Sequence, residues 1–153
     1  MIVEGNDLLP GSPDAIWDLL MDPDVLAKAM PGTRSLERVA PDRYEGVMRV
    51  GIGPITAAEF ELTIALSEVQ RPERYAMQID SKGKFGFTRG LARVELVPGE
   101  TGTVMRYSAD LQVGGKIAAL GQRLLESVSK LMLRQGLAAL QQELQSRLGG
   151  TAA

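Results

Sequence analysis

The side chains that most enzymes use for proton transfer and covalent catalysis are missing from this sequence. Its 153 residues contain no histidine and no cysteine. Thiol nucleophiles, imidazole bases, Ser-His-Asp triads and Cys/His zinc sites are therefore excluded. Tyrosine and carboxylate side chains remain, and both can act as acid and base. An enzymatic function of this chain would therefore depend on Tyr44, Tyr75 or Tyr107 together with a carboxylate.

Two groups of carboxylates have spacings that occur in functional sites. One is a set of four aspartates that could supply an oxygen-only metal site: Asp14, Asp18, Asp22 and Asp24. All four belong to predicted short helices, where an aspartate caps the helix or interacts with its dipole. The other group is Glu59 and Glu61, which alternate with apolar residues and are expected on a solvated sheet face. We expect no metal site and no catalytic residue in either group.

The glycines and arginines of the predicted strands give weaker signals. Gly51 and Gly53 form a GxG pattern, but Pro54 follows and the next segment has strand character. A phosphate loop needs a helix amino terminus after the glycines, so we interpret the pattern as a strand kink. One arginine of a strand could point inward and hold the polar head of a ligand. Outward positions with buried stems are more common, and we expect them for Arg49, Arg93 and Arg106.

The composition excludes several classes of partner. The formal net charge is −2 and the sequence contains no block of like charges, which argues against nucleic-acid binding. No apolar run approaches the roughly 18 residues of a membrane span. The amino terminus reaches Glu4 and Asp7 without the apolar stretch of a secretory signal. We therefore expect a cytoplasmic protein whose contact with a membrane is at most peripheral.

The first part of the chain predicts one strand and two short helices. Residues 2–9 have strand character and end at Pro10-Gly11. Ser12 is then a helix cap with proline at the first helical position. Asp22 begins a second helix in the same way, and that helix ends at Pro31-Gly32.

The middle of the chain predicts an antiparallel sheet. Six strand-length segments follow one another between turns that contain proline or glycine: residues 35–40, 43–50, 56–69, 74–80, 90–97 and 103–113. In the third segment Phe60, Leu62, Ile64 and Leu66 alternate with mostly polar residues. A period of two indicates a sheet with one covered face, so an element that covers this face is required.

The carboxy-terminal segment predicts the covering helix, from about Lys116 to Leu148. Apolar residues recur there at helical spacing: Ile117, Leu120, Leu124, Val128, Leu131, Leu137, Leu140, Leu144 and Leu148. We expect a bend at Gly136 and helix-stabilising pairs between Glu126 and Lys130 and between Glu143 and Arg147. Residues 149–153 are expected to form a disordered tail after a single domain of residues 1–148.

These elements predict an α+β fold. A curved antiparallel sheet of about seven strands wraps around a long carboxy-terminal helix, and two short helices follow the first strand. The start of the long helix contains Gly115, Ala118, Ala119 and Gly121. These small residues either pack against the Pro31-Gly32 turn or leave room for a ligand to enter. Close packing predicts that Gly121→Ala destabilises the protein by collision, whereas an entrance predicts intact stability and weaker ligand uptake.

Two stretches of the sequence resemble signatures of a known family. They are "DPDVLAKAMPGTRSLE" at 22–37 and "VGGKIAALGQRLL" at 113–125, and "VGIGPI" at 50–55 lies between them in the matching order. Together they resemble the CoxG family of carbon monoxide dehydrogenase subunits. That family belongs to the helix-grip superfamily of START-like, polyketide-cyclase and Bet v 1-like (SRPBCC) proteins. The resemblance covers residues 2–148.

The resemblance implies a non-enzymatic accessory protein that works beside molybdenum-containing hydroxylases of the carbon monoxide dehydrogenase type. It also implies a hydrophobic ligand, quinone-like or lipid-like, between sheet and helix, with no covalently bound cofactor. Family members are thought to assist recruitment of the enzyme to the inner face of the membrane. Thr33 stands where members often carry cysteine, so a role of that thiol is not carried over. Longer members continue into a proline-rich linker and an anchor beyond the position of Ala153.

The residues expected to line the ligand cavity come from the predicted helices and from the covered face of the sheet. They are Trp17, Met30, Phe60, Leu62, Met77, Tyr107, Gly121, Leu124, Val128 and Met132. A filled core that leaves function to the surface explains such residues about as well. With seventeen glycines but only three phenylalanines and one tryptophan, the chain has little bulk to fill a wide interior, which favours a cavity. The alternative function is a cyclase-like or hydrolase-like enzyme acting on a hydrophobic substrate.

Overall fold

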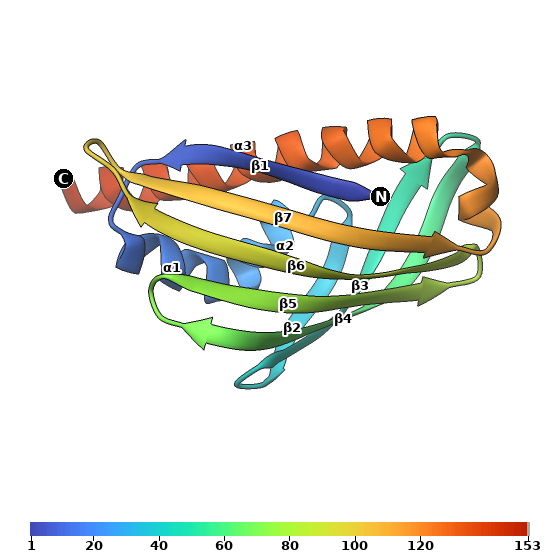
Figure 1. Cartoon of the computed structure of the whole chain (residues 1–153), viewed down its shortest axis with the longest axis horizontal. Coiled ribbons are helices and arrows are strands. Elements are labelled where there is room, and N and C mark those ends of the chain that lie inside the picture. Colours follow the sequence, from blue (N-terminus) through green and yellow to red (C-terminus); the bar gives the residue numbers. More distant parts are fainter. Residues whose placement is uncertain (153) are drawn as a thin grey trace.

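The protein has the predicted α+β architecture, with a curved antiparallel sheet and a long helix along it (Figure 1). The computed structural model describes the backbone of residues 1–152 and the side chains of residues 1–147. The seven strands are ordered β1-β7-β6-β5-β4-β3-β2, and neighbouring strands are antiparallel. The elements are β1 (Ile2–Leu9), α1 (Pro13–Met21), α2 (Pro23–Ala29), β2 (Thr33–Ala40), β3 (Arg43–Ile52), β4 (Ile55–Gln70), β5 (Arg74–Gly83), β6 (Gly86–Pro98), β7 (Thr103–Gly114), the 3₁₀ helix η1 (Lys116–Leu120) and α3 (Gln122–Ala152).

The caps of the two short helices are confirmed. The Ser12 hydroxyl accepts a hydrogen bond from the Ala15 amide at 3.2 Å. The Asp22 carboxylate accepts one from the Asp24 amide at 2.9 Å, and proline occupies the first turn of both helices. Each cap satisfies an amide that has no partner within its helix. These local bonds fix where α1 and α2 begin.

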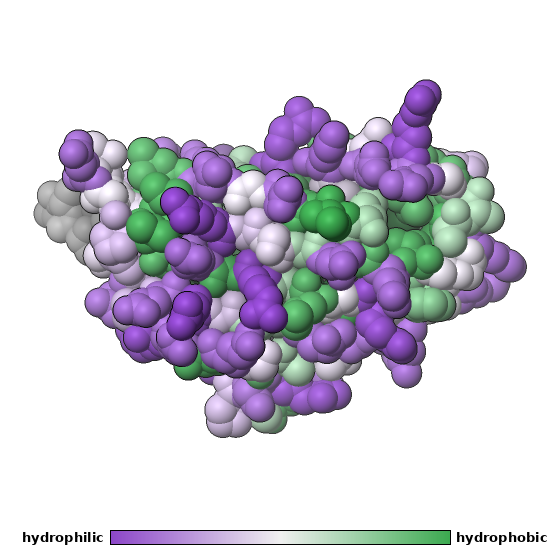
Figure 2. Space-filling view, in the orientation of Figure 1, coloured by the Kyte–Doolittle hydropathy of each residue, from purple (hydrophilic) through white to green (hydrophobic). Residues whose placement is uncertain are grey.

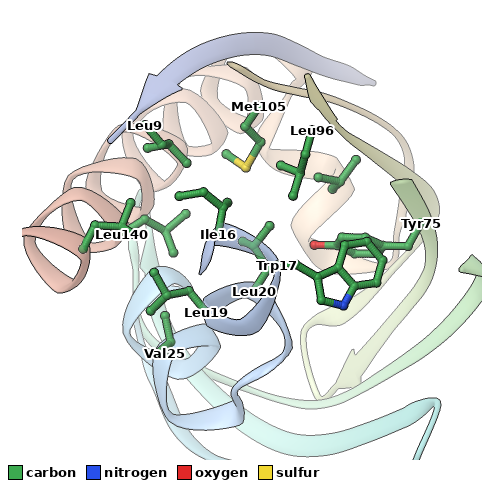
Figure 3. Close-up of a cluster of buried hydrophobic side chains, with 12 residues drawn as sticks. Leu9, Ile16, Trp17, Leu19, Leu20, Val25, Tyr75, Leu96, Met105 and Leu140 are labelled. Carbon is green, nitrogen blue, oxygen red and sulfur yellow. The ribbon is translucent and has the colours of Figure 1, made fainter. Parts of the chain in front are cut away.

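The hydrophobic core is divided among three clusters. The largest lies where α1 and the carboxy-terminal half of α3 meet the sheet (Figure 3). Its buried members are Leu9, Ile16, Trp17, Leu19, Leu20, Val25, Tyr75, Val94, Leu96, Met105, Leu140 and Leu144. A second cluster contains Leu26, Tyr44, Leu62 and Ile64, and a third joins η1 to the β3–β4 end through Ile52, Ala58, Phe60 and Ile117. The first and third clusters therefore close opposite ends of the interior.

The prediction of one helix from Lys116 is wrong at its beginning. Residues 116–120 form the separate 3₁₀ helix η1, and α3 begins at Gln122. Gly121 has φ +96° and ψ 149°, a conformation that is open to glycine and strained for other residues, so it separates the two helices. An added Cβ at Gly121 would meet no atom within 4 Å. Of the two alternatives for Gly121, close packing against the Pro31-Gly32 turn is therefore wrong.

The close contact occurs at Gly136 instead. A Cβ built there would lie 2.3 Å from the backbone oxygen of Ala29, at the end of α2. Gly136 is buried, and α3 continues through it as one helix. The sequence signal was interpreted as a bend, whereas the structure uses the glycine to bring two helix backbones together.

Two further predictions for α3 are wrong and one is confirmed. Leu131 is 48% exposed because nine residues, about 2.5 turns, separate it from the buried Leu140 and place it on the opposite helix face. Among the described residues Glu126 forms no ion pair with Lys130. Its carboxylate instead accepts a hydrogen bond from the side-chain amide of Gln122 at 3.0 Å. The pair of Glu143 and Arg147 is present at 3.4 Å. The predicted disordered tail, 149–153, lies outside the residues whose side chains are described.

The charged contacts of α3 connect it to α2. Lys28 Nζ lies 3.2 Å from Glu143 Oε2, and Arg147 Nη2 lies 3.3 Å from Asp22 Oδ2. Hydrogen bonding from Lys28 holds the pKa of the Glu143 carboxyl below its ordinary value, and Arg147 contributes in the same direction. These pairs fix the same helix contact that Gly136 makes possible.

Candidate functional site

The inner face of the sheet carries small side chains in its middle. The strand register aligns Met77, Ala92 and Ala109 across β5, β6 and β7. Ser81 and Thr88 pair further along β5 and β6. All five are an even number of residues from the buried Tyr75, Val94 or Met105 of their strand and therefore face the same side. This side faces α3.

These inner residues and the helix residues opposite them are not sealed from solvent. Met77, Ser81, Thr88 and Ala109 are half-buried. The half-buried residues of α3 include Leu124, Leu125, Val128 and Met132. Fully buried side chains concentrate instead in the clusters at the two ends of the interior. This burial pattern is that of a partly open zone between the sheet and the first half of α3.

The Tyr75 hydroxyl is a buried polar group without a hydrogen-bond partner among the described residues. Tyr75 is only 4% exposed, and among the described residues its oxygen has no hydrogen-bond partner. No side-chain nitrogen or oxygen of these residues is both sealed from solvent and without a partner, so the hydroxyl oxygen must border accessible space. In Figure 3 the oxygen points away from the sheet toward the interior, and the ring meets Trp17 edge-on at 5.2 Å. Tyr75 thus offers a free hydrogen-bond donor inside the protein.

The other two tyrosines have different surroundings. Tyr44 is fully buried, and its hydroxyl donates a hydrogen bond to the Met21 backbone oxygen at 2.7 Å. Tyr107 is half-buried and its ring covers Gly5, where a Cβ would lie 2.6 Å from the hydroxyl oxygen. Burial raises the pKa of the Tyr107 hydroxyl, and the Asp7 carboxylate adds to the effect. The three hydroxyls therefore do not form one catalytic group, because Tyr44 is committed to the backbone.

The predicted site residues are found in two kinds of surroundings. Trp17, Phe60 and Leu62 are buried, each in a different core cluster. The half-buried predicted residues are Met30, Met77, Tyr107, Leu124, Val128 and Met132. Gly121 is exposed. Their role in ligand binding stays a prediction.

Sequence reasoning missed three small inner residues, Ser81, Thr88 and Ala109, and treated Tyr75 only as a possible acid or base. The period-two alternation of β5 and β6 could have placed Ser81 and Thr88 on the inner face. It could not have shown that the Tyr75 hydroxyl lacks a partner.

The remaining polar surroundings give no second site in the interior. Among the residues described, no three carboxylates gather closely enough to hold a metal ion. Arg71 lies 3.5 Å from Asp14 and 2.9 Å from Asp18, so these two aspartates form surface ion pairs. Two hollows of about 630 and 570 Å³ have their charged side chains on the outer face of the sheet, and Tyr75 and Tyr107 contribute to the lining of the first. No helix in the described part of the chain is long and apolar enough to cross a membrane.

The tyrosines predict an unusual alkaline titration. Burial raises the pKa of the Tyr44, Tyr75 and Tyr107 hydroxyls above the ordinary value of 10.0. At pH 10 the folded protein should show much less tyrosinate absorbance than the same protein in denaturant. The unfolded chain releases these protons at a lower pH than the folded protein does. The contribution of the buried tyrosines to the free energy of unfolding is therefore fully present below about pH 10 and decreases as the pH rises further. Coinciding titration curves of the folded and unfolded protein would contradict the buried environments.

The fold and its interior define a class of protein. Seven antiparallel strands that curve around a long carboxy-terminal helix, with two short helices after the first strand, are the helix-grip fold of START-like proteins. A START superfamily protein from Mycobacterium smegmatis has this fold, with a TM-score of 0.72 at 15% identity over 95% of this chain and 97% of that chain. The di-domain ARO/CYC StfQ from the steffimycin biosynthetic pathway matches with a TM-score of 0.68 at 14% identity, over 97% of this chain and 52% of its own.

Within this class, the chain belongs to the CoxG family of carbon monoxide dehydrogenase subunits, whose sequence profile matches residues 8–145. A conserved protein from Geobacillus kaustophilus is similar along nearly the whole length. Its TM-score is 0.88 at 29% identity, over 95% of this chain and 96% of that chain. No curated protein sequence matches the chain significantly.

Proposed function

We propose that this protein is a non-enzymatic accessory protein that holds a neutral, quinone-like ligand between its sheet and α3. The observation that carries the proposal is the free Tyr75 hydroxyl, which is buried yet borders accessible space. A phenol whose pKa is raised by burial stays protonated at physiological pH. It is therefore a hydrogen-bond donor, and the group it suits is a carbonyl oxygen of an otherwise apolar molecule.

The charges of the sheet favour a neutral ligand over an anionic one. In β3 to β7 every lysine and arginine occupies an outward position, since each lies an odd number of residues from a buried inner residue of its strand. These residues are Arg43, Arg49, Arg74, Lys82, Arg89, Arg93 and Arg106. A carboxylate carried into the interior would find no cation on these strands, and burying an unpaired charge is costly. A quinone fits this interior better than a fatty acid does.

The proposal extends to a partner and a location. Membership in the CoxG family supports an association with a carbon monoxide dehydrogenase-type molybdenum hydroxylase. A ligand that dissolves in membranes also favours a cytoplasmic protein that contacts the inner face of the membrane peripherally. The enzymatic alternative is not proposed, because Tyr44, whose hydroxyl adds to the effect of burial on the pKa of Tyr75, donates a hydrogen bond to the Met21 backbone oxygen.

A fluorescence titration tests the ligand. Trp17 is the single tryptophan of the chain and touches Tyr75, so a ligand that reaches this hydroxyl should quench its emission. We expect saturable quenching by decylubiquinone and none by palmitate at the same concentration. Saturable binding of palmitate alone, or of neither compound, would contradict the proposal.

Affinity capture from the native host tests the partner. It should recover hydroxylase subunits, and their consistent absence would contradict the proposed association.

A further inference from the structure

The outer face of the sheet contains a polar hollow that is separate from the interior. It has a volume of about 630 Å³, and its lining combines charged and polar residues of β4, β5, β6 and β7 with parts of Tyr75, Val94 and Tyr107. Its arginines are Arg74, Arg93 and Arg106, one from each of β5, β6 and β7. Figure 2 views this side of the sheet, and hydrophilic side chains crowd its surface. The three arginines alternate along their strands with the inward-facing Tyr75, Val94 and Tyr107, so the arginine side chains lie on the face of the sheet opposite α3.

An irregularity of β4 helps to form one wall of the hollow. The pairing of β4 with β5 is interrupted between Ser67 and Gln70. Within this bulge Glu68 has φ +51°, the one non-glycine residue with positive φ among those described. Such a conformation is strained for a side-chain-bearing residue and persists where surrounding contacts hold it. Bulges of this kind redirect side chains, and here Glu68 and Gln70 both line the hollow.

The two residues of the bulge orient two of the arginines. Arg93 Nη1 donates a hydrogen bond to Glu68 Oε2, and Arg74 Nε donates one to Gln70 Oε1 at 3.1 Å. Arg106 forms no ion pair within the described part of the chain, although Glu95 occupies the position between it and Arg74. Two guanidinium groups are thus held in place beside a third that has free donors.

The charge of the hollow favours an anion. Its lining contains three arginines and two glutamates, so it is positive in a chain whose net charge is −2. The Ser108 hydroxyl, which pairs across from Arg93, adds a neutral donor at the same place. Planar guanidinium groups match carboxylate and phosphate oxygens, often through two parallel hydrogen bonds. We propose that this hollow is a binding site for an oxyanion, a carboxylate or a phosphate group, in which Arg106 makes the principal contact.

Isothermal titration calorimetry at an ionic strength of about 0.15 M, where exposed charges are screened, tests the site. The probes are inorganic phosphate, citrate and a hexaglutamate peptide. We expect at least one of them to bind the native protein and Arg106→Gln to weaken that binding about tenfold, because charge-assisted hydrogen bonds are lost. Binding of phosphate or citrate identifies a free small anion as the source, whereas binding of the peptide alone identifies a carboxylate-bearing protein segment.

Arg89→Gln is the matched control. Arg89 lies on the same outer face, outside this hollow, and pairs with Asp80 at 3.0 Å. It should change the affinity by less than about twofold, and both variants should keep the native circular dichroism spectrum and Tm, since exposed ion pairs contribute little to stability. The absence of binding by all three probes, or an equal loss in both variants, would overturn the proposal. Quinone binding to Arg106→Gln should be unchanged, so the two proposals succeed or fail separately.

Discussion

Replacing Gly136 by alanine is expected to destabilise the protein by about 2 kcal/mol or more, the typical effect of overpacking a tight contact. Alanine is the better helix former by about 1 kcal/mol, so helix propensity alone predicts the opposite sign. The new methyl group would lie 2.3 Å from the backbone oxygen of Ala29. That atom belongs to the end of α2 and cannot rotate away as a side chain can, so α2 and α3 must separate.

Urea unfolding of the wild type and the variant measures this effect. Gln135→Ala is the matched control, because Gln135 is the exposed neighbour of Gly136 in the same helix. Its stability should change by no more than about 0.5 kcal/mol. A Gly136→Ala variant as stable as the control would show that α2 and α3 do not touch at this residue.

The Gly121→Ala variant measures how much stability is lost through backbone strain when no steric collision occurs. Nothing lies within 4 Å of a Cβ at Gly121, but its φ of +96° is unfavourable for alanine. It should therefore lose about 1–3 kcal/mol through backbone strain alone. The ψ of 149° at Gly121 lies outside the left-handed region that asparagine tolerates, so Gly121→Asn should lose about as much stability as Gly121→Ala. In Gly136→Asn the larger side chain meets the same Ala29 oxygen, so this variant should be no more stable than Gly136→Ala.

The contrast between these glycines shows which parts of the fold the sequence predicts. The caps at Ser12 and Asp22 and the alternation along β4 are local signals, and the structure confirms them. The function of a glycine depends on what approaches it from elsewhere in the chain. Gly121 had the stronger local signal, in a run of small residues, but the contact forms at Gly136 because α2 crosses α3 there. Sequence spacing contains no information about that crossing.

The candidate site shows the same division. Half-buried residues of α3 such as Val128 and Met132 follow from helical periodicity, since they share a face with other apolar residues. Which inner residues of β5 and β6 become neighbours, as Ser81 and Thr88 do, depends on the register between the strands, which the sequence does not give. The free hydroxyl of Tyr75 and the hollow beside the Glu68 bulge are products of tertiary packing. Both features depend on which polar groups find partners in the folded protein.

Two tyrosine substitutions should have opposite effects on ligand binding and on stability. Tyr75→Phe removes a hydroxyl that has no partner within the described residues, so stability should change by no more than about 0.5 kcal/mol. Quinone affinity should decrease about tenfold, the effect of losing one hydrogen bond of about 1.4 kcal/mol. Tyr44→Phe instead removes the donor to the Met21 backbone oxygen. Because that oxygen is left without this bond, the protein should lose about 1–3 kcal/mol of stability.

Both variants are measured by the same pair of experiments, urea unfolding and quenching of Trp17 fluorescence by decylubiquinone. The substitution is chemically identical in the two proteins, so any difference reports the surroundings of the hydroxyl. Tyr44→Phe should keep the wild-type affinity, because its hydroxyl is 2.7 Å from Met21 and is not available to a ligand. If Tyr75→Phe destabilises the protein and leaves affinity unchanged, its hydroxyl has a structural partner and the proposed ligand contact is wrong. If both variants lose affinity equally, the quinone responds to general loosening of the interior rather than to a hydrogen bond from Tyr75.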